Sequence, residues 1–171
     1  MNVFNFAMEM EEQGFEYYQS LAKAATLPGL KTIFSSLAED ERKHFEVFLT
    51  LKEGKLAGTL PEAASLDTAK NVFLLLPRGD EALKGMTDAL PSYRHAMQLE
   101  AESFRLYEEA AAKEENAEIK ALLLKIAEQE HQHFNILENV YNFVNAPNQH
   151  LVWGEFSNLG EFRQFGRDTD I

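Results

Sequence analysis

The sequence contains no cysteine among its 171 residues. This absence excludes disulfide bonds, thiolate zinc sites, iron–sulfur clusters and cysteine nucleophiles. Basic residues are also scarce, because 16 Lys and Arg stand against 28 Asp and Glu, which gives a formal net charge of −12. Nucleic acids and anionic membrane surfaces are held largely by Lys and Arg, so we expect neither as a partner.

Long apolar runs are missing as well. The longest covers only residues 72–77, which is far too short to span a bilayer. The first residues carry no basic segment and soon meet Glu9, Glu11 and Glu12, which is untypical of a targeting peptide. We therefore expect a cytoplasmic protein. The apolar fraction of 45%, with 13 Phe, indicates a folded chain of one domain despite its acidity.

Helical periodicity dominates what is present. Apolar residues at spacings of three, four and seven predict four long amphipathic helices, two within about residues 3–53 and two within about 92–145. The link of about residues 55–90 is long enough to cross the full length of a bundle, and it holds two predicted short helices, capped at Asp67 and Asp80. We therefore predict an all-α fold over residues 1–145, in which two antiparallel hairpins joined by a crossover form a four-helix bundle.

Residues 146–171 differ from the rest of the chain. They mix Asn and Gly with Trp and Phe and show only weak periodicity. We predict an extended C-terminal tail that packs its aromatic side chains on the bundle or on a partner chain.

The two predicted hairpins are copies of one another. A shift of 89 residues without gaps places Phe15 on Phe104 and Tyr18 on Tyr107. Such self-similarity predicts two hairpins related by a pseudo-twofold axis.

Six polar residues interrupt the apolar faces of these helices. Glu11, for example, lies between Met8 and Phe15 at helical spacing, so it shares their inward face. The offset of 89 relates all six, as Glu11 to Glu100, Glu41 to Glu130 and His44 to His133. In each half a single Glu precedes a Glu-x-x-His pair by 30 residues.

Burying four carboxylates demands compensation. An unpaired carboxylate in an apolar core costs several kcal/mol, and the nearby Arg42, Lys43 and Lys52 fall outside the inward faces. Two divalent metal ions would supply four positive charges. Oxygen and nitrogen donors without thiolate suit iron or manganese. The alternative is a degenerate site whose carboxylates are protonated or solvated by trapped water.

In these motifs the sequence resembles the rubrerythrins, a branch of the ferritin-like superfamily, over about residues 1–145. The residues that carry the resemblance are Glu11-x6-Tyr18, Glu41-Arg42-Lys43-His44, Glu100-x6-Tyr107 and Glu130-His131-Gln132-His133. It implies a ferritin-like four-helix bundle with a pair of iron ions held by Glu11, Glu41, His44, Glu100, Glu130 and His133.

The resemblance also assigns roles within the site. Glu41 and Glu130 would bridge the two metals. Tyr18 and Tyr107 would donate hydrogen bonds to ligand carboxylates, although each can equally be an ordinary aromatic residue of the core. His131 lies off the inward stripe, and neither His95 nor His150 has a partner at ligand spacing, so we expect none of the three to bind metal.

Two departures from the family pattern follow. Full-length rubrerythrins carry a four-cysteine rubredoxin domain, which a chain without cysteine lacks. They also carry an extra inward Glu three residues after the ligand on the third helix, where this chain has Ser103. The absence of that Glu implies a more symmetric site.

The function implied is an oxidoreductase that reduces peroxide or dioxygen with electrons from an external donor, such as a separate rubredoxin or a reductase. One alternative is a ferroxidase or iron-handling protein, and another is a structural or sensory dimer that the metal only stabilises. The expected metals are two iron ions, although manganese uses the same ligands and adventitious zinc can fill such a site. We expect a homodimer, which is the commonest closed assembly.

Overall fold

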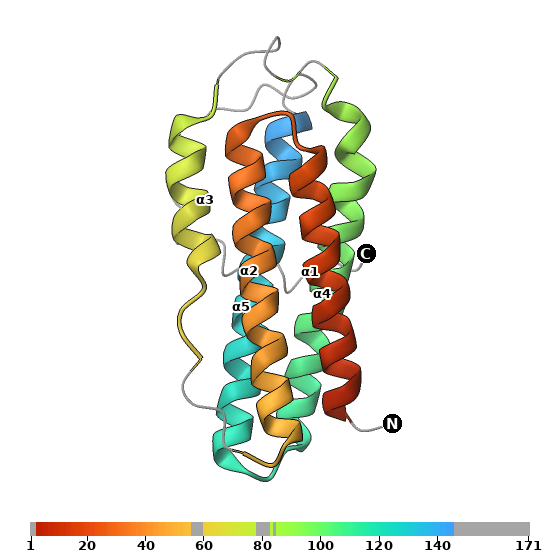
Figure 1. Ribbon diagram of the computed structural model, residues 1–171, viewed down its shortest axis with the longest axis vertical. Coiled ribbons are helices and arrows are strands. Elements are labelled where there is room, and N and C mark those ends of the chain that lie inside the picture. The colour runs from red at the N-terminus through yellow and green to blue at the C-terminus, as the bar shows by residue number, and fades with distance from the viewer. Residues whose placement is uncertain (1–2, 56–59, 78–82, 84, 146–171) are drawn as a thin grey trace.

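Four long helices pair as two hairpins in the computed structural model (Figure 1). The structure describes residues 3–55, 60–77, 83 and 85–145. Over these residues the elements are α1 (Val3–Ala24), α2 (Pro28–Lys52), α3 (Ala64–Leu75), the short 3-10 helix η2 (Thr87–Ala89), α4 (Leu90–Lys113) and α5 (Ala117–Asn145). No strand occurs in the part of the chain so described, and the predicted all-α bundle is confirmed.

The ends of the helices follow local chemistry. Pro28 lies in the first turn of α2, where its missing N–H leaves no hydrogen bond unmade, and Pro91 has the same place in α4. The helix α2 ends just before Gly54, whose φ of 70° lies in the left-handed region that glycine adopts readily. Only residues 25–27 connect α1 to α2, and α1 packs along α2 as α4 packs along α5.

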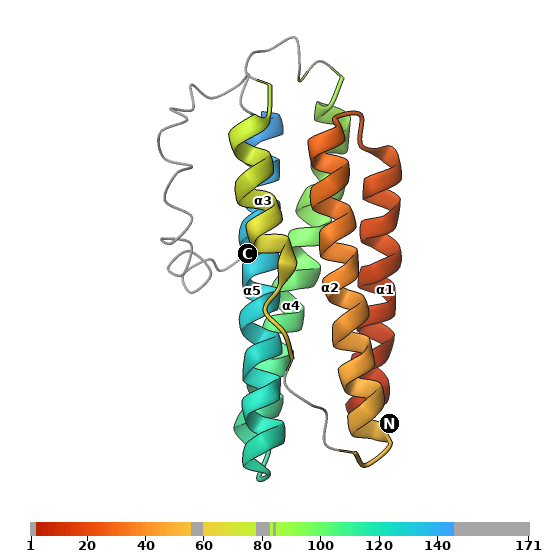
Figure 2. The ribbon, with the colours of Figure 1, turned by 60° about the vertical axis from the view of Figure 1, so that its left-hand side comes forward.

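The crossover carries the helix α3 on the outside of the bundle, beside α2 and α5 (Figures 1 and 2). The prediction that Asp67 caps this helix is wrong, because α3 begins at Ala64 and Asp67 lies within its first turn. The free N–H groups of Ala64 and Ser65 are instead satisfied by the carboxylate of Asp40, which comes from α2. A cap from a distant helix leaves no local sequence signal.

Other sequence-based predictions fall outside the described residues. The second short helix, with its cap at Asp80, and the C-terminal tail of residues 146–171 are among them. None of the helices in the described ranges is long and apolar enough to cross a membrane.

The core consists of two apolar clusters with a polar layer between them. One cluster holds Tyr18 and Leu37 with the C-terminal half of α5, and the other holds Ala7, Phe48 and Ile126. Each long helix thus leaves one cluster, passes a short stretch with buried polar residues, and enters the other. The candidate functional residues lie in this middle layer.

Candidate metal centre

All six predicted ligands are brought together by the fold. The helices α1 and α4 contribute one Glu each, and α2 and α5 contribute a Glu-x-x-His pair each. None of the six is more than 5% exposed. The residues are Glu11, Glu41, His44, Glu100, Glu130 and His133.

The six side chains form two overlapping groups, each with the donor atoms for one metal ion. Within each group, one donor atom from every residue lies within 4.8 Å of the others. The groups are Glu11, Glu41, His44 and Glu130, and Glu41, Glu100, Glu130 and His133. Glu41 and Glu130 belong to both, which is the geometry that a bridging carboxylate requires.

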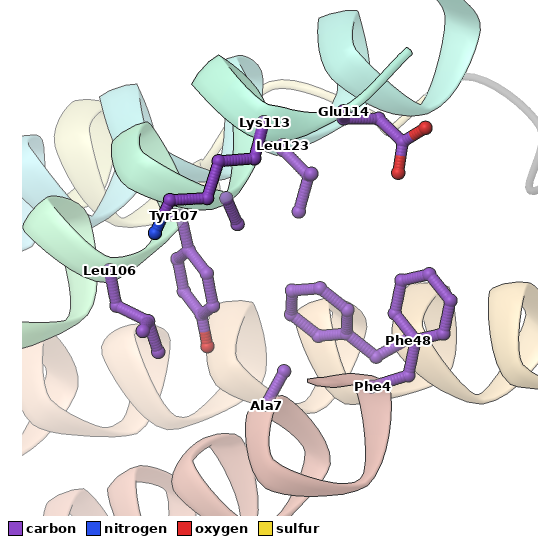
Figure 3. Close-up of a pocket in the computed structure, with 9 residues that line it drawn as sticks. Phe4, Ala7, Phe48, Leu106, Tyr107, Lys113, Glu114 and Leu123 are labelled. Atoms are coloured by element: carbon purple, nitrogen blue, oxygen red, sulfur yellow. The ribbon is translucent and has the colours of Figure 1, made fainter. Parts of the chain in front are cut away.

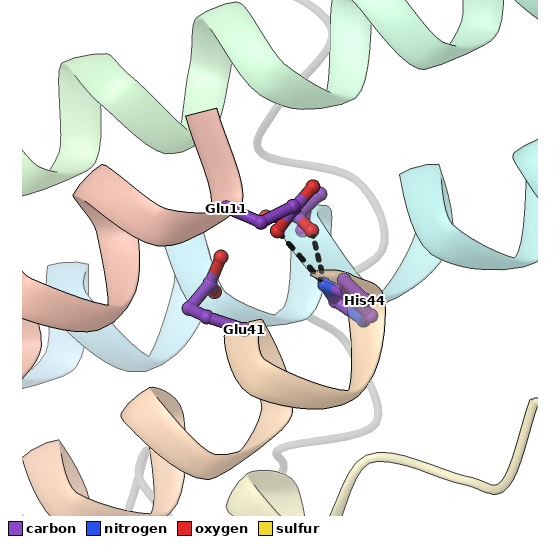
Figure 4. A group of neighbouring side chains, drawn as sticks. Glu11, Glu41 and His44 are labelled. Carbon is purple, nitrogen blue, oxygen red and sulfur yellow. Dashed lines mark ion pairs between the residues drawn. The ribbon is translucent and has the colours of Figure 1, made fainter. Parts of the chain in front are cut away.

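Around His44, the Nδ1 atom faces carboxylates of two other helices. It lies 2.7 Å from Oε1 of Glu130 and 3.4 Å from Oε2 of Glu11. Figure 4 shows Glu11, Glu41 and His44 pointing toward one another from α1 and α2. The ring therefore presents Nδ1, not Nε2, to the centre.

His133 repeats this arrangement from the other hairpin. Its Nδ1 lies 2.9 Å from Oε1 of Glu41 and 3.7 Å from Oε1 of Glu100. The two imidazole rings stack with their centroids 5.8 Å apart and their planes at 24°. The two hairpins thus place equivalent histidines face to face at the centre.

The ionisable groups of this layer shift one another's pKa values strongly. Burial and the charge of Glu130 raise the pKa of both Glu11 and Glu100 well above the usual value. Burial alone would lower the pKa of His44 and His133, but the surrounding carboxylates outweigh it and raise the pKa of both. The pKa of Glu130 is lowered despite its burial, because both histidines face it. In this geometry, protons bound to these glutamates and histidines offset the negative charge that no cation balances.

Several buried atoms at the centre lack hydrogen bonds even so. They include Oε1 of Glu41, both carboxylate oxygens of Glu130 and Nδ1 of both histidines, which approach one another closely without hydrogen-bond geometry. A buried polar atom without a partner is costly, and these atoms converge from groups that could hold a metal ion. The set therefore fits two divalent cations, and its oxygen and nitrogen donors suit iron or manganese.

Two tyrosines donate hydrogen bonds to the two carboxylates that belong to only one of the groups. In each pair, the tyrosine and the carboxylate come from opposite hairpins. The hydroxyl of Tyr18 on α1 donates to Oε1 of Glu100, and that of Tyr107 on α4 donates to Oε1 of Glu11. Both tyrosines are no more than 2% exposed. Burial and the charge of Glu11 raise the pKa of Tyr107, so its hydroxyl keeps its proton. These contacts are the ones that the family resemblance implied.

Sequence reasoning missed two buried residues behind the histidines. Oε1 of Gln129 lies 2.7 Å from Nε2 of His44, and Oδ2 of Asp40 lies 3.6 Å from Nε2 of His133. Asp40 and Gln129 are related by the same offset of 89 and directly precede the Glu of each Glu-x-x-His pair. That position in the repeat was the available signal. It was hidden because the two residues differ in type.

The comparison with protein families agrees with this centre. The family model named Rubrerythrin matches residues 2–141, which is most of the chain. The chain belongs to the rubrerythrin family. Searches of curated proteins and of solved structures found no match.

Among the other histidines of this chain, His95 packs edge-on against Tyr17 and His131 packs edge-on against Phe104. Neither belongs to the two metal-binding groups found in the described residues, and His150 lies outside those residues.

Gly14 is the partner of Ser103 under the repeat, and it packs against the centre. A Cβ atom added at Gly14 would lie 3.0 Å from Oε2 of Glu41. Glycine therefore leaves α1 room for a carboxylate that belongs to both metal-binding groups.

A cavity of about 260 Å³ adjoins the centre on the side of Tyr107. Its lining is mainly apolar and runs from Lys113, which is exposed, to Tyr107, which is buried. Figure 3 shows the rings of Phe4, Phe48 and Tyr107 around the same space. Tyr107 thus connects the wall of the cavity to Glu11, to which it donates a hydrogen bond.

Proposed function

We propose that this chain holds two iron ions in its central layer and reduces peroxide or dioxygen with electrons from a donor outside these residues. The observation that carries the proposal is the pair of overlapping four-residue groups that share Glu41 and Glu130. Four carboxylates carry the charge that two divalent cations balance. The two histidines complete the nitrogen donors.

The residues would divide their work by position. Glu11 and His44 would hold one ion, Glu100 and His133 the other, and Glu41 with Glu130 would hold both. When bound, the iron pair supplies two electrons as its ions pass from the ferrous to the ferric state. Reduction of one hydrogen peroxide to two water molecules consumes those two electrons and two protons.

The chain's own contribution is to exclude water and to keep protons close. The six side chains are almost fully buried, so the apolar clusters shield the centre on both sides. Tyr18 and Tyr107 direct their hydroxyl hydrogens at the carboxylates of Glu100 and Glu11. Because these 171 residues contain no cysteine, they hold no rubredoxin-type iron site. A rubredoxin or a reductase is the kind of donor that would return the electrons.

The test compares two double variants that are matched by the repeat. Glu41→Gln/Glu130→Gln removes the two shared carboxylates, whereas Glu39→Gln/Glu128→Gln removes two exposed ones from the same helices. Iron content and anaerobic peroxide consumption with an added electron donor are measured for each. We expect about two iron ions per chain and many turnovers for the wild type and the surface variant, and neither for the site variant.

Other results would favour the alternatives. A single stoichiometric oxidation followed by no further consumption contradicts catalytic peroxide reduction. Ferric iron accumulating well beyond about two ions per chain would indicate ferroxidase or iron-handling activity. Tight metal binding that stabilises the fold, with no reaction toward peroxide or dioxygen, would indicate a structural or sensory role.

A further inference from the structure

The two histidines of the centre meet different groups on their outer side. Every inner residue has a chemically identical partner under the repeat, because each Glu corresponds to a Glu and each His to a His. The symmetry breaks at the next layer, where Asp40 corresponds to Gln129. Both are buried, with exposures of 1% and 3%. Each faces Nε2 of the histidine from the opposite hairpin.

On one side, the amide of Gln129 is oriented by the crossover. Its Nε2 donates to the backbone carbonyl of Pro61 at 2.8 Å, which leaves Oε1 to face Nε2 of His44 at 2.7 Å. That oxygen can only accept, so Nε2 of His44 carries the hydrogen. When a metal ion displaces the proton on the other nitrogen, Nδ1 of His44 presents its lone pair to the centre, as a metal ligand requires.

On the other side, Asp40 is oriented by the same crossover through opposite chemistry. Its carboxylate accepts from the backbone N–H of Ser65 at 3.1 Å and of Ala64 at 3.4 Å, and from Nζ of Lys43 at 2.9 Å. Lys43 contacts Oδ1, whereas Oδ2 is the oxygen that faces Nε2 of His133 at 3.6 Å. At 3.6 Å the two atoms lie at ion-pair distance without forming a hydrogen bond, so His133 has the charge of an anion behind it where His44 has a hydrogen-bonded neutral amide.

The crossover explains why the repeat is broken at these two positions. A single segment passes both, so it cannot present the same groups to each. It offers a carbonyl at Pro61, which requires a donor, and it offers the N–H groups at the start of α3, which require an acceptor. Glutamine meets the first requirement and aspartate the second.

We propose that Asp40 and Gln129 make the two metal positions unequal, so that the ion held by His133 binds more tightly and is the first to be stabilised in the ferric state. A carboxylate behind a metal-bound imidazole raises its basicity and its donor strength, and a neutral amide does so less. Asp40 and Gln129 are positioning residues, since they act on the metals only through the histidines. The inference rests on the proposed two-iron centre and adds the order in which its two positions bind and oxidise iron.

The experiment uses the full chain loaded with ferrous iron. Calorimetry gives the two binding steps, and proton NMR of the paramagnetic ferrous protein gives the shifted, exchangeable Nε2 hydrogens of the two histidines. Removal of a group behind a metal ligand typically weakens metal affinity by about 10- to 100-fold. Asp40→Asn should therefore weaken one binding step by that factor, leave the other unchanged and move only one of the two shifted resonances.

Gln129→Glu tests the opposite position. It places a carboxylate behind His44, so it should move the other resonance and strengthen the weaker binding step. Glu39→Gln and Glu128→Gln remove exposed charges next to each position and should change neither step. A merely structural role for Asp40 would weaken both steps together and shift both resonances, and that result would overturn the proposal.

A second measurement does not depend on any variant folding. Mössbauer spectra of the wild-type diferrous and half-oxidised protein should show two distinct iron environments, and a single environment overturns the inequality. Two ions bound in identical environments would leave the proposed metal centre standing. Fewer than two ions bound to the wild type would defeat the proposed function itself, and the inference with it.

Discussion

Tyr18 on α1 donates its hydroxyl hydrogen to Oε1 of Glu100 on α4, across the interface between the two hairpins. Tyr107 and Glu11 repeat the contact in the opposite direction. Each hairpin thus supplies one of these two carboxylates and the tyrosine that donates a hydrogen bond to the other. The site assembles only when the two hairpins dock.

Tyr18→Phe should weaken metal binding while the fold persists. The change removes one hydroxyl and leaves Oε1 of Glu100 buried without its donor, so this ligand is no longer held in one orientation. Groups behind metal ligands are typically worth about 10- to 100-fold in affinity, and we expect a loss in that range, measured by ferrous titration. Tyr93→Phe is the matched control, because Tyr93 is also buried but packs on Phe34 in an apolar cluster. Equal losses in both variants would show that the hydroxyl of Tyr18 has no specific role.

Metal removal should make the free energy of unfolding decrease as pH rises. Glu11, Glu100, His44 and His133 all have pKa values raised in the folded metal-free protein. The folded state therefore binds more protons than the unfolded chain above the usual pKa values of 4.5 for Glu and 6.5 for His. The stability that these protons provide is present at low pH and is lost as pH rises through the raised pKa values.

Urea unfolding at several pH values, with a chelator and with added ferrous iron under anaerobic conditions, measures this. The metal-free protein should lose stability from about pH 5 toward pH 9. The loaded protein should hold its stability, because metal ions replace the protons and bind more tightly as pH rises. The lowered pKa of Glu130 affects stability only below the usual glutamate value of 4.5, so it does not reverse the sign over this range. Rising stability of the metal-free protein over this range would contradict the charge balance described for the centre.

Gly14→Ala should separate metal binding from folding. Alanine gains about 1 kcal/mol over glycine in a helix interior, which favours the folded state. Its Cβ would meet Oε2 of Glu41 at 3.0 Å, so the carboxylate, which belongs to both groups, must shift slightly. We expect unchanged or higher thermal stability of the metal-free protein and weaker binding of the second metal ion. Ser103→Ala, at the related position on α4, provides the comparison, and an equal effect there would rule out the specific contact with Glu41.

The repeat explains how much of the centre could be predicted from the sequence. Glu11 and Tyr18 share one face of one helix, as do Glu41 and His44, so helical spacing and the offset of 89 sufficed to place them together. The repeat alone did not reveal the roles of Asp40 and Gln129, because the groups that orient them, at Pro61 and at the start of α3, lie on a crossover whose path depends on tertiary packing. The start of α3 was misplaced at Asp67 for the same reason, since its N–H groups are satisfied from α2.

We expect the apolar cavity beside Tyr107 to admit dioxygen more readily than peroxide. Its mainly apolar lining suits dioxygen better than peroxide, because peroxide would lose its hydrogen bonds to water there. Ala110→Leu fills part of the cavity and keeps a strong helix former on α4, so iron content and thermal stability should not change. We expect oxidation of the ferrous protein by dioxygen to slow severalfold in stopped-flow measurements, with little change in the rate with peroxide. Ala121→Leu, on the exposed face of α5, should alter neither rate. If Ala110→Leu slows both oxidants equally, the cavity is a shared entrance, and if it slows neither, dioxygen reaches the centre by another path.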